Sequence, residues 1–195
     1  ALKGEVCYLN KKVHHTGYIY ENEAQKMAHA KRNITSLLEA LEEFPDNVRY
    51  KLQLIQEYHD IRDYEKMEEA CSSALNYLKG LKKESYELGR IYLSAFHTGL
   101  ILSEKCLGKT EEALSSFKNA LADDRLIEVG KARIYSLGAL LYKKQNDFDR
   151  AIECADSFLD IYKKYSEDFE YVGRNTVLYS KDAYTVEVLN ETVMV

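Results

Sequence analysis

Three windows of the sequence repeat one pattern, and this self-similarity constrains the fold more than any single motif does. The windows cover residues 52–75, 99–121 and 138–159. Each has a segment of apolar and tyrosine positions, a short polar turn, and a second segment whose core residues recur every three or four positions. That spacing places side chains on one face of a helix. Each window therefore predicts a helical hairpin.

The second segments share four aligned positions, most of them small or apolar. The aligned sets are Tyr64, Thr110 and Phe148; Met67, Ala113 and Ala151; Cys71, Phe117 and Ala155; and Ala74, Ala120 and Phe158. The pattern resembles the tetratricopeptide repeat (TPR), a helix-turn-helix unit in which small residues let helices approach closely. The resemblance implies an all-α protein, a right-handed superhelix of antiparallel helix pairs. Because one hairpin leaves apolar faces uncovered, neighbouring hairpins must stack to bury them.

Three features depart from the usual repeat. Met67 replaces an alanine, Glu104 lies where an aromatic residue is expected, and the second-helix anchors are 46 (64 to 110) and 38 (110 to 148) residues apart. The usual period is about 34 residues. We therefore expect longer first helices or an insertion, most plainly the segment KGLKKESYELG.

The composition agrees with a helical chain and narrows its partners. One proline and nine glycines in 195 residues favour long helices with short connections. A formal net charge of -5 argues against nucleic acid or an anionic membrane as the main partner. The sequence contains no apolar run of membrane-spanning length. The four cysteines lack C-x-x-C spacing, so we expect reduced core residues in a cytoplasmic protein.

The chain divides into four parts on its periodicity. Residues 1–20 alternate weakly and predict a short extended segment. Residues 21–44 have helical spacing and predict one linking or capping helix that ends before Pro45. Residues 45–170 hold the three repeats, at about 47–80, 86–125 and 130–166. Residues 171–195 predict a partial further repeat or a capping helix. The start at Ala1 and the apolar end TVMV suggest a fragment.

Candidate catalytic groups are sparse. His14 and His15 are adjacent, so on a strand they point to opposite faces and cannot hold one ion together. His29, His59 and His97 lie in separate helical segments. The sequence offers no Ser-His-Asp context, glycine-rich phosphate loop, zinc ligand set or Asp-x-Asp motif. We expect no catalytic residue and no cofactor in this chain.

The groove of the predicted superhelix is the remaining candidate site. TPR proteins hold ligands on the first helix of each hairpin, and the matching positions here are Arg49, Gln56, His59 and Asp60; Thr98, Leu102 and Lys105; and Arg133, Ser136, Leu140, Lys143 and Lys144. Five of these residues are cationic, which suits an acidic peptide or a carboxylate. A solvated face without a ligand is an equally good interpretation of the same positions.

Residues 14–58 resemble a junction in bacterial family 2 glycosyltransferases that carry TPRs at the C-terminal end. There a strand ending in His-x-Gly-Tyr leads into a helix and a first repeat. The matching residues are His15, Gly17 and Tyr18; Arg32 and Asn33; Leu37, Leu38 and Glu39; Pro45 and Asp46; and Gln56, Glu57 and Tyr58. The resemblance implies that residues 1–20 are the remnant of an upstream catalytic domain.

In such a parent enzyme, a nucleotide-sugar donor and a divalent metal would bind upstream, with His15 as one metal-site residue. This chain alone would be inert, and its partner would be the catalytic domain, a protein or a peptide. The alternative is a free-standing TPR adaptor that binds an acidic peptide in its groove. A small metal enzyme using His14 or His15 is the least favoured hypothesis.

Overall fold

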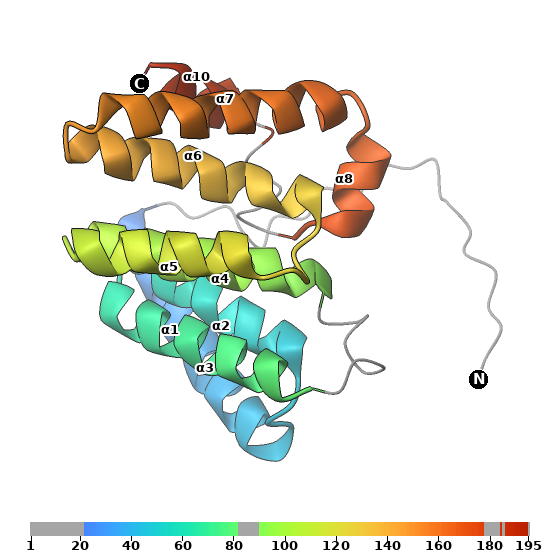
Figure 1. The fold of residues 1–195 in the computed structure, drawn as a ribbon. Helices are drawn as coiled ribbons and strands as arrows, with labels where there is room; N and C mark the ends of the chain where they lie inside the picture. Colours follow the sequence, from blue (N-terminus) through green and yellow to red (C-terminus); the bar gives the residue numbers. More distant parts are fainter. Residues whose placement is uncertain (1–21, 82–89, 178–183, 185, 195) are drawn as a thin grey trace, which may run out of the picture.

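The computed structural model describes residues 22–81, 90–177, 184 and 186–194, and this part of the chain is helical apart from its turns and caps (Figure 1). The helices are α1 (Glu23–Glu43), α2 (Val48–Asp60), α3 (Tyr64–Gly80), α4 (Arg90–Cys106), α5 (Thr110–Ala122), α6 (Glu128–Lys144), α7 (Phe148–Tyr165), α8 (Phe169–Asn175) and α10 (Val186–Val193). The predicted fold class is confirmed: antiparallel helix pairs stack in the TPR-like manner. The extended segment predicted at 1–20 lies outside the described residues.

The turns within the three pairs share one backbone feature. Arg62, Gly108 and Asn146 all adopt positive φ, at 59°, 77° and 60°. Each lies two residues before the second helix of its pair. A left-handed residue ends the first helix and reverses the chain, and only glycine adopts it without steric cost. The three connections are therefore copies of one turn, although a glycine occupies only the middle one.

The pairs α2/α3, α4/α5 and α6/α7 stack in chain order, with α1 against α2 at one end and α10 against α6 and α7 at the other (Figure 1). One apolar core runs from α2 to α7. Glycines allow the close approach between pairs. A Cβ on Gly99 would lie 2.8 Å from Cys71 Sγ, and one on Gly138 would lie 2.4 Å from Phe117 Cε2. Cys71 and Phe117 thus occupy the same repeat position against a glycine of the next pair.

The two residues that depart from the usual TPR pattern, Met67 and Glu104, are both buried. Met67 is fully buried and belongs to the main core, so the larger side chain at the alanine position is accommodated. Glu104 is also buried, with 6% of its surface exposed. Cys71 and Cys154 are buried and free of disulfides, whereas Cys106 is exposed. The expectation that the cysteines are core residues is therefore wrong for Cys106, which is the last residue of α4.

Candidate functional site

The described residues contain no cluster of metal-ligating side chains. Within 22–81, 90–177, 184 and 186–194, no three His, Cys, Asp or Glu side chains gather closely enough to hold an ion. No helix in that part of the chain combines the length and apolar character needed to cross a membrane. His15, the residue that the glycosyltransferase resemblance assigns to a metal site, lies outside the described residues.

A polar hollow of about 530 Å³ lies between α1 and α2. Its lining residues are Asn33, Ser36, Leu37, Ala40, Tyr50, Gln53, Gln56, Glu57 and Asp60. Asn33 Nδ2 donates a hydrogen bond to Glu57 Oε1 at 2.7 Å, which ties the two helices across the hollow. Two of the predicted groove residues, Gln56 and Asp60, therefore face a real depression together. Its walls carry two carboxylates and several groups that both donate and accept hydrogen bonds.

The other predicted positions on α2 lie outside this hollow. Arg49 is exposed at the start of the helix. His59 is half-buried near its end, where Nδ1 lies 3.7 Å from Asp60 Oδ1 and the ring meets Tyr64 edge to face at 6.3 Å. The first repeat thus presents its polar residues at separate places along α2.

The predicted positions on α4 are partly enclosed. Thr98 is fully buried, and its Oγ1 has no hydrogen-bond partner among the described residues. Leu102 and Lys105 are half-buried. Lys105 lies in the last turn of α4, where a cation offsets the partial negative charge of the helix end. The middle of the predicted groove therefore offers Lys105 as its charged group.

The predicted positions on α6 are covered in large part by α10. Arg133 Nη1 lies 3.7 Å from Glu191 Oε2, and buried Ser136 is hydrogen-bonded to Thr192 Oγ1 at 2.8 Å. Lys143 Nζ donates to the main-chain oxygen of Met194 at 2.7 Å. Lys144, next along the chain, is exposed, and Leu140 is half-buried. The third repeat therefore already holds a helix of the same chain on this face.

A partly buried charge cluster that sequence reasoning missed joins the first two helix pairs and the connection that leads to the third. Arg125 donates to both carboxylate oxygens of Asp123 at 2.7 Å and to the main-chain oxygen of Leu78 at 3.1 Å. His97 Nε2 lies 3.5 Å from Asp123 Oδ2. Burial alone would raise the pKa of the Asp123 carboxyl, but hydrogen bonds from Arg125 outweigh it and lower the pKa to about 2.

Burial lowers the pKa of His97, which keeps the imidazole neutral at neutral pH despite the neighbouring carboxylate. The members of this cluster come from distant parts of the sequence, so no local motif could have revealed it. It links the end of α3 to α4 and to the connection between α5 and α6. Its geometry is that of a clamp between helices.

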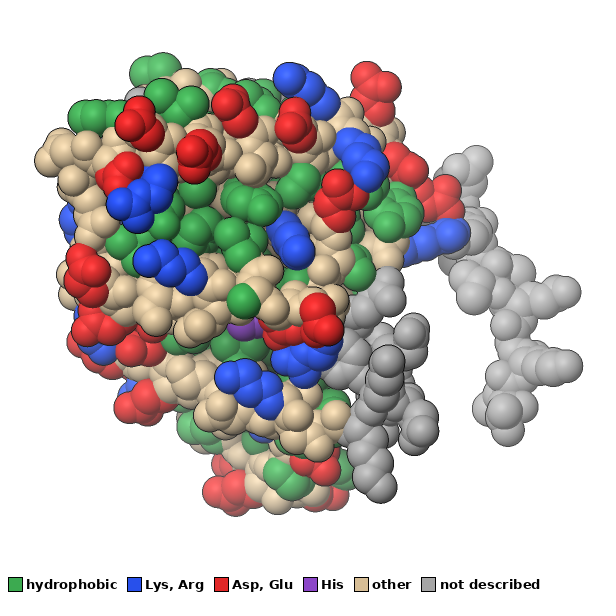
Figure 2. Space-filling view, viewed as in Figure 1, with side chains coloured by type: hydrophobic (Ala, Val, Ile, Leu, Met, Phe, Trp, Pro, Cys, Tyr) green, Lys and Arg blue, Asp and Glu red, His purple; other side chains and the backbone are tan. Residues whose placement is uncertain are grey.

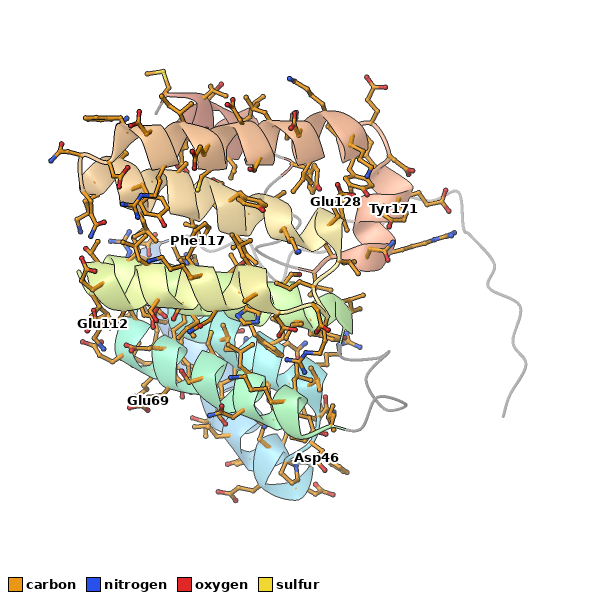
Figure 3. The ribbon with its side chains drawn as sticks, in the orientation of Figure 1. Asp46, Glu69, Glu112, Phe117, Glu128 and Tyr171 are labelled. Carbon is orange, nitrogen blue, oxygen red and sulfur yellow. The ribbon has the colours of Figure 1, made fainter. Side chains whose placement is uncertain are left out.

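A second hollow, about 220 Å³ in volume, is lined by aromatic and polar side chains of α5, α6 and α7. Figure 2 shows hydrophobic side chains gathered on this face, and Figure 3 places Phe117 at the junction of α5 and α6. Phe117 meets Tyr135 and Tyr142 edge to face at 6.4 and 5.9 Å. Burial raises the pKa of the Cys154 thiol in its wall to about 11, so this thiol is a poor nucleophile.

A tyrosine cluster surrounds the start of α6. Tyr165 Oη donates to Glu128 Oε2 at 2.7 Å, and its ring stacks on Tyr171 of α8 at 5.3 Å. Glu128 and Tyr171 lie close together in Figure 3. Lys164 also donates to Glu128, and these two hydrogen bonds lower the pKa of its carboxyl. The cluster fastens α8 and α7 to α6.

Comparisons with known proteins give structural matches alone. No protein-family model and no curated protein sequence matches the chain. The crystal structure of BtubC (BKLC) from P. vanneervenii superposes with a TM-score of 0.56 at 16% identity, over 90% of this chain and 74% of that one. The crystal structure of MamA superposes with a TM-score of 0.47 at 19% identity, over 90% and 95% of the two chains. The similarity to BtubC supports the fold, an all-α stack of TPR-like helix pairs.

Proposed function

We propose that this chain is a non-catalytic protein-interaction module that holds a peptide segment of its partner. The hollow between α1 and α2 carries the proposal. Its lining combines Asn33, Gln53 and Gln56, whose amide groups both donate and accept hydrogen bonds. A peptide main chain offers alternating donors and acceptors, so these side chains suit it whatever its sequence. Stacked helix pairs present such a surface without the need for a reactive group.

The finer proposal is that the bound peptide is acidic and reaches the cations at the ends of α4 and α6. Each of these helices is the first member of a pair, so both run in the same direction and their last turns lie at the same end of the stack. Lys105 ends one helix and Lys143 and Lys144 end the next. Glu57 and Asp60 would repel an acidic residue from the α1/α2 hollow, so the acidic part belongs at the lysines.

Calorimetry with acidic peptides tests this proposal. The variant Lys105→Glu/Lys144→Glu reverses the charge of two lysines and leaves Lys143, which contacts Met194, unchanged. We expect binding to weaken at least about tenfold. The control Lys118→Glu/Lys163→Glu makes the same change of net charge at exposed positions on the second helices of their pairs. Equal loss in both variants, or no loss in either, would exclude a peptide site at the lysines.

A second candidate follows from residues 14–58, which resemble the junction of family 2 glycosyltransferases. The chain would then be the C-terminal module of an enzyme that uses a nucleotide-sugar donor, with the catalytic domain as its neighbour. The free thiols of Cys71, Cys106 and Cys154 support a reducing, cytoplasmic setting. Sequencing the full gene tests this: about 200 or more upstream residues with an Asp-x-Asp motif would support it. An initiator Met directly before Ala1 would exclude it.

A further inference from the structure

The face of α6 beneath α10 has features of a helix-docking surface. Val188 of α10 is 5% exposed and packs with Ala132 of α6 and with Phe158 and Ile161 of the adjoining α7. Thr192, one turn further along, is fully buried. The two anchors are four residues apart, so they lie on one face of the helix. The docked helix thus contributes one apolar and one hydroxyl anchor.

Polar contacts fix the register of α10 on this face. Thr192 Oγ1 and Ser136 Oγ are hydrogen-bonded at 2.8 Å, and Glu191 lies within ion-pair distance of Arg133. At the end of the helix, Lys143 Nζ donates to the main-chain oxygen of Met194. Three of the predicted groove residues therefore contact a helix rather than an extended peptide.

The receptor side is shaped for close approach. Ala132 and Ser136 are both fully buried and lie four residues apart on α6, so small side chains form the floor under α10. Arg133 and Lys143 stand beside this floor and supply the positive charge. A helix with small or apolar anchors and an acidic residue beside them fits this surface in shape and in charge.

The occupant itself has little independent structure. α10 has eight residues, about two turns. An isolated helix of that length is unstable in water, because nucleation is unfavourable and few hydrogen bonds follow it. Its helical form therefore depends on docking, and its last residue Val193 and the following Met194 remain exposed. Undocking exposes Val188 and Thr192 and breaks the contacts of Thr192 with Ser136, of Glu191 with Arg133 and of Met194 with Lys143.

We propose that this face of α6 is a docking site for an amphipathic acidic helix of a protein partner, and that α10 is an exchangeable occupant that the partner displaces. The pattern recognised is the one α10 shows, Val-x-x-Glu-Thr-x-Met at 188–194. This inference rests on the proposed function, that the chain binds a protein partner. It deepens that function by naming a helical ligand and a competitor built into the chain.

A synthetic peptide of residues 184–194, labelled with fluorescein, serves as the probe against the full chain. The variant Val188→Asp releases α10 while leaving the α6 surface unchanged. We expect the peptide to bind this variant at least about tenfold more tightly than wild type, because in wild type the tethered helix competes at high effective concentration. A peptide that itself carries Val188→Asp is the matched control and should not bind. Fluorescence anisotropy gives both affinities.

A charge exchange tests the register. Adding Arg133→Glu to the Val188→Asp chain should weaken the wild-type peptide at least about threefold, because like charges then face each other, and a Glu191→Arg peptide should recover the loss. If circular dichroism shows that the Val188→Asp chain is unfolded, the milder variant Glu191→Arg/Thr192→Val takes its place. Equal binding of the peptide to wild-type and released chains, or binding to neither, would overturn the proposal.

The outcome is separable from that of the proposed function. The probe is the chain's own segment, whereas the calorimetry uses acidic peptides and the lysines Lys105 and Lys144. If the segment fails to bind but acidic peptides do, the exchange of α10 is refuted and the interaction module stands. If the segment binds and acidic peptides do not, the acidic-peptide proposal fails while the docking site remains.

Discussion

Glu104 is a carboxyl group that is largely shielded from water. It is buried where the repeat pattern expects an aromatic residue, and its Oε2 lacks a hydrogen-bond partner among the described residues. Ser116 donates to the other oxygen at 3.0 Å. Burial raises its pKa from 4.5 to about 6. The charged form is thus disfavoured in the folded chain.

Glu104→Gln should therefore stabilise the protein at neutral pH. Because the folded pKa lies above the unfolded value, the wild type loses stability as pH rises from 4.5 through 6. The loss at pH 7 amounts to about 2 kcal/mol in the free energy of unfolding. Urea unfolding should show this gain for Glu104→Gln at pH 7 and no gain at pH 4. The exposed control Glu39→Gln should change little at either pH, and a gain that persists at pH 4 would contradict the explanation.

Replacement by alanine should have opposite effects on the free energy of unfolding at two helical glycines. Gly138→Ala places a methyl group 2.4 Å from a carbon of the Phe117 ring, which Tyr135 and Tyr142 hold in place. We expect overpacking to cost about 1–3 kcal/mol in the free energy of unfolding. Gly173→Ala meets nothing within 4 Å and should stabilise α8 by up to about 1 kcal/mol. Urea titration of both variants measures their free energies of unfolding. If both variants are destabilised, the space around each glycine does not explain the effect of the substitution.

The environment of a residue could be predicted from the sequence where the repeat pattern assigned that residue a position in the helix pair. The pattern identified Glu104 as a misfit, and it aligned Cys71 with Phe117, which both pack against a glycine of the next pair. It also marked Thr98 and Ser136 as groove residues, yet both are fully buried. Their burial depends on neighbouring helices, and Ser136 lies under a helix 50 residues away in the sequence. Local periodicity carries no information about such a neighbour.

The connections between helices depend on the clamp formed by Asp123, Arg125 and His97. Asp123→Asn should remove its charge-assisted hydrogen bonds and cost about 2 kcal/mol in the free energy of unfolding at pH 7. Since hydrogen bonding to Arg125 overcomes burial and lowers the pKa of the Asp123 carboxyl from 3.8 to about 2, this contribution is present above pH 4 and is lost as pH falls through 2. The gap between variant and wild type should narrow over that range.

Denaturant unfolding at pH 7, 4 and 2.5 measures this gap. Asp124→Asn, at the exposed neighbouring position, is the control and should differ little from wild type at any pH. A gap between Asp123→Asn and wild type that stays constant from pH 7 to 2.5 would show that the carboxylate charge does not hold the clamp.

Helices were easier to predict than the way in which they end and meet. The helical spacing within residues 21–44 predicted one linking or capping helix, and α1 spans Glu23–Glu43. The left-handed turns at Arg62 and Asn146 were hidden, because neither residue signals positive φ as glycine does. Residues 171–195 were predicted to form a partial further repeat or a capping helix. The structure has the helix α10 there. The spacing of its residues could not reveal that this segment contacts Arg133 and Lys143.

Burial varies along the stack, because each helix contacts mainly its neighbours and the end helices have fewer of them. The repeat pattern predicted this architecture because core residues recur at corresponding positions in the second segment of each window. Seven consecutive residues of α4, 93–99, are buried, and α6 is enclosed by α4, α5, α7, α8 and α10. By contrast, α1 contributes a single fully enclosed residue, Ala30, and packs on α2.

Hydrogen exchange under native conditions should therefore divide the chain into zones. We expect amides in the middle of α4 and α6 to exchange through global unfolding, because opening either helix breaks contacts on both sides of the stack. Amides of α1 and α10 should open with free energies at least about 2 kcal/mol lower, since among the described helices each packs at one end of the stack. Increasing urea should leave the α1 and α10 openings nearly unchanged and lower the others. Equal protection of α1 and α6 at every urea concentration would mean that the pairs unfold as one unit and that the stacking order does not govern stability.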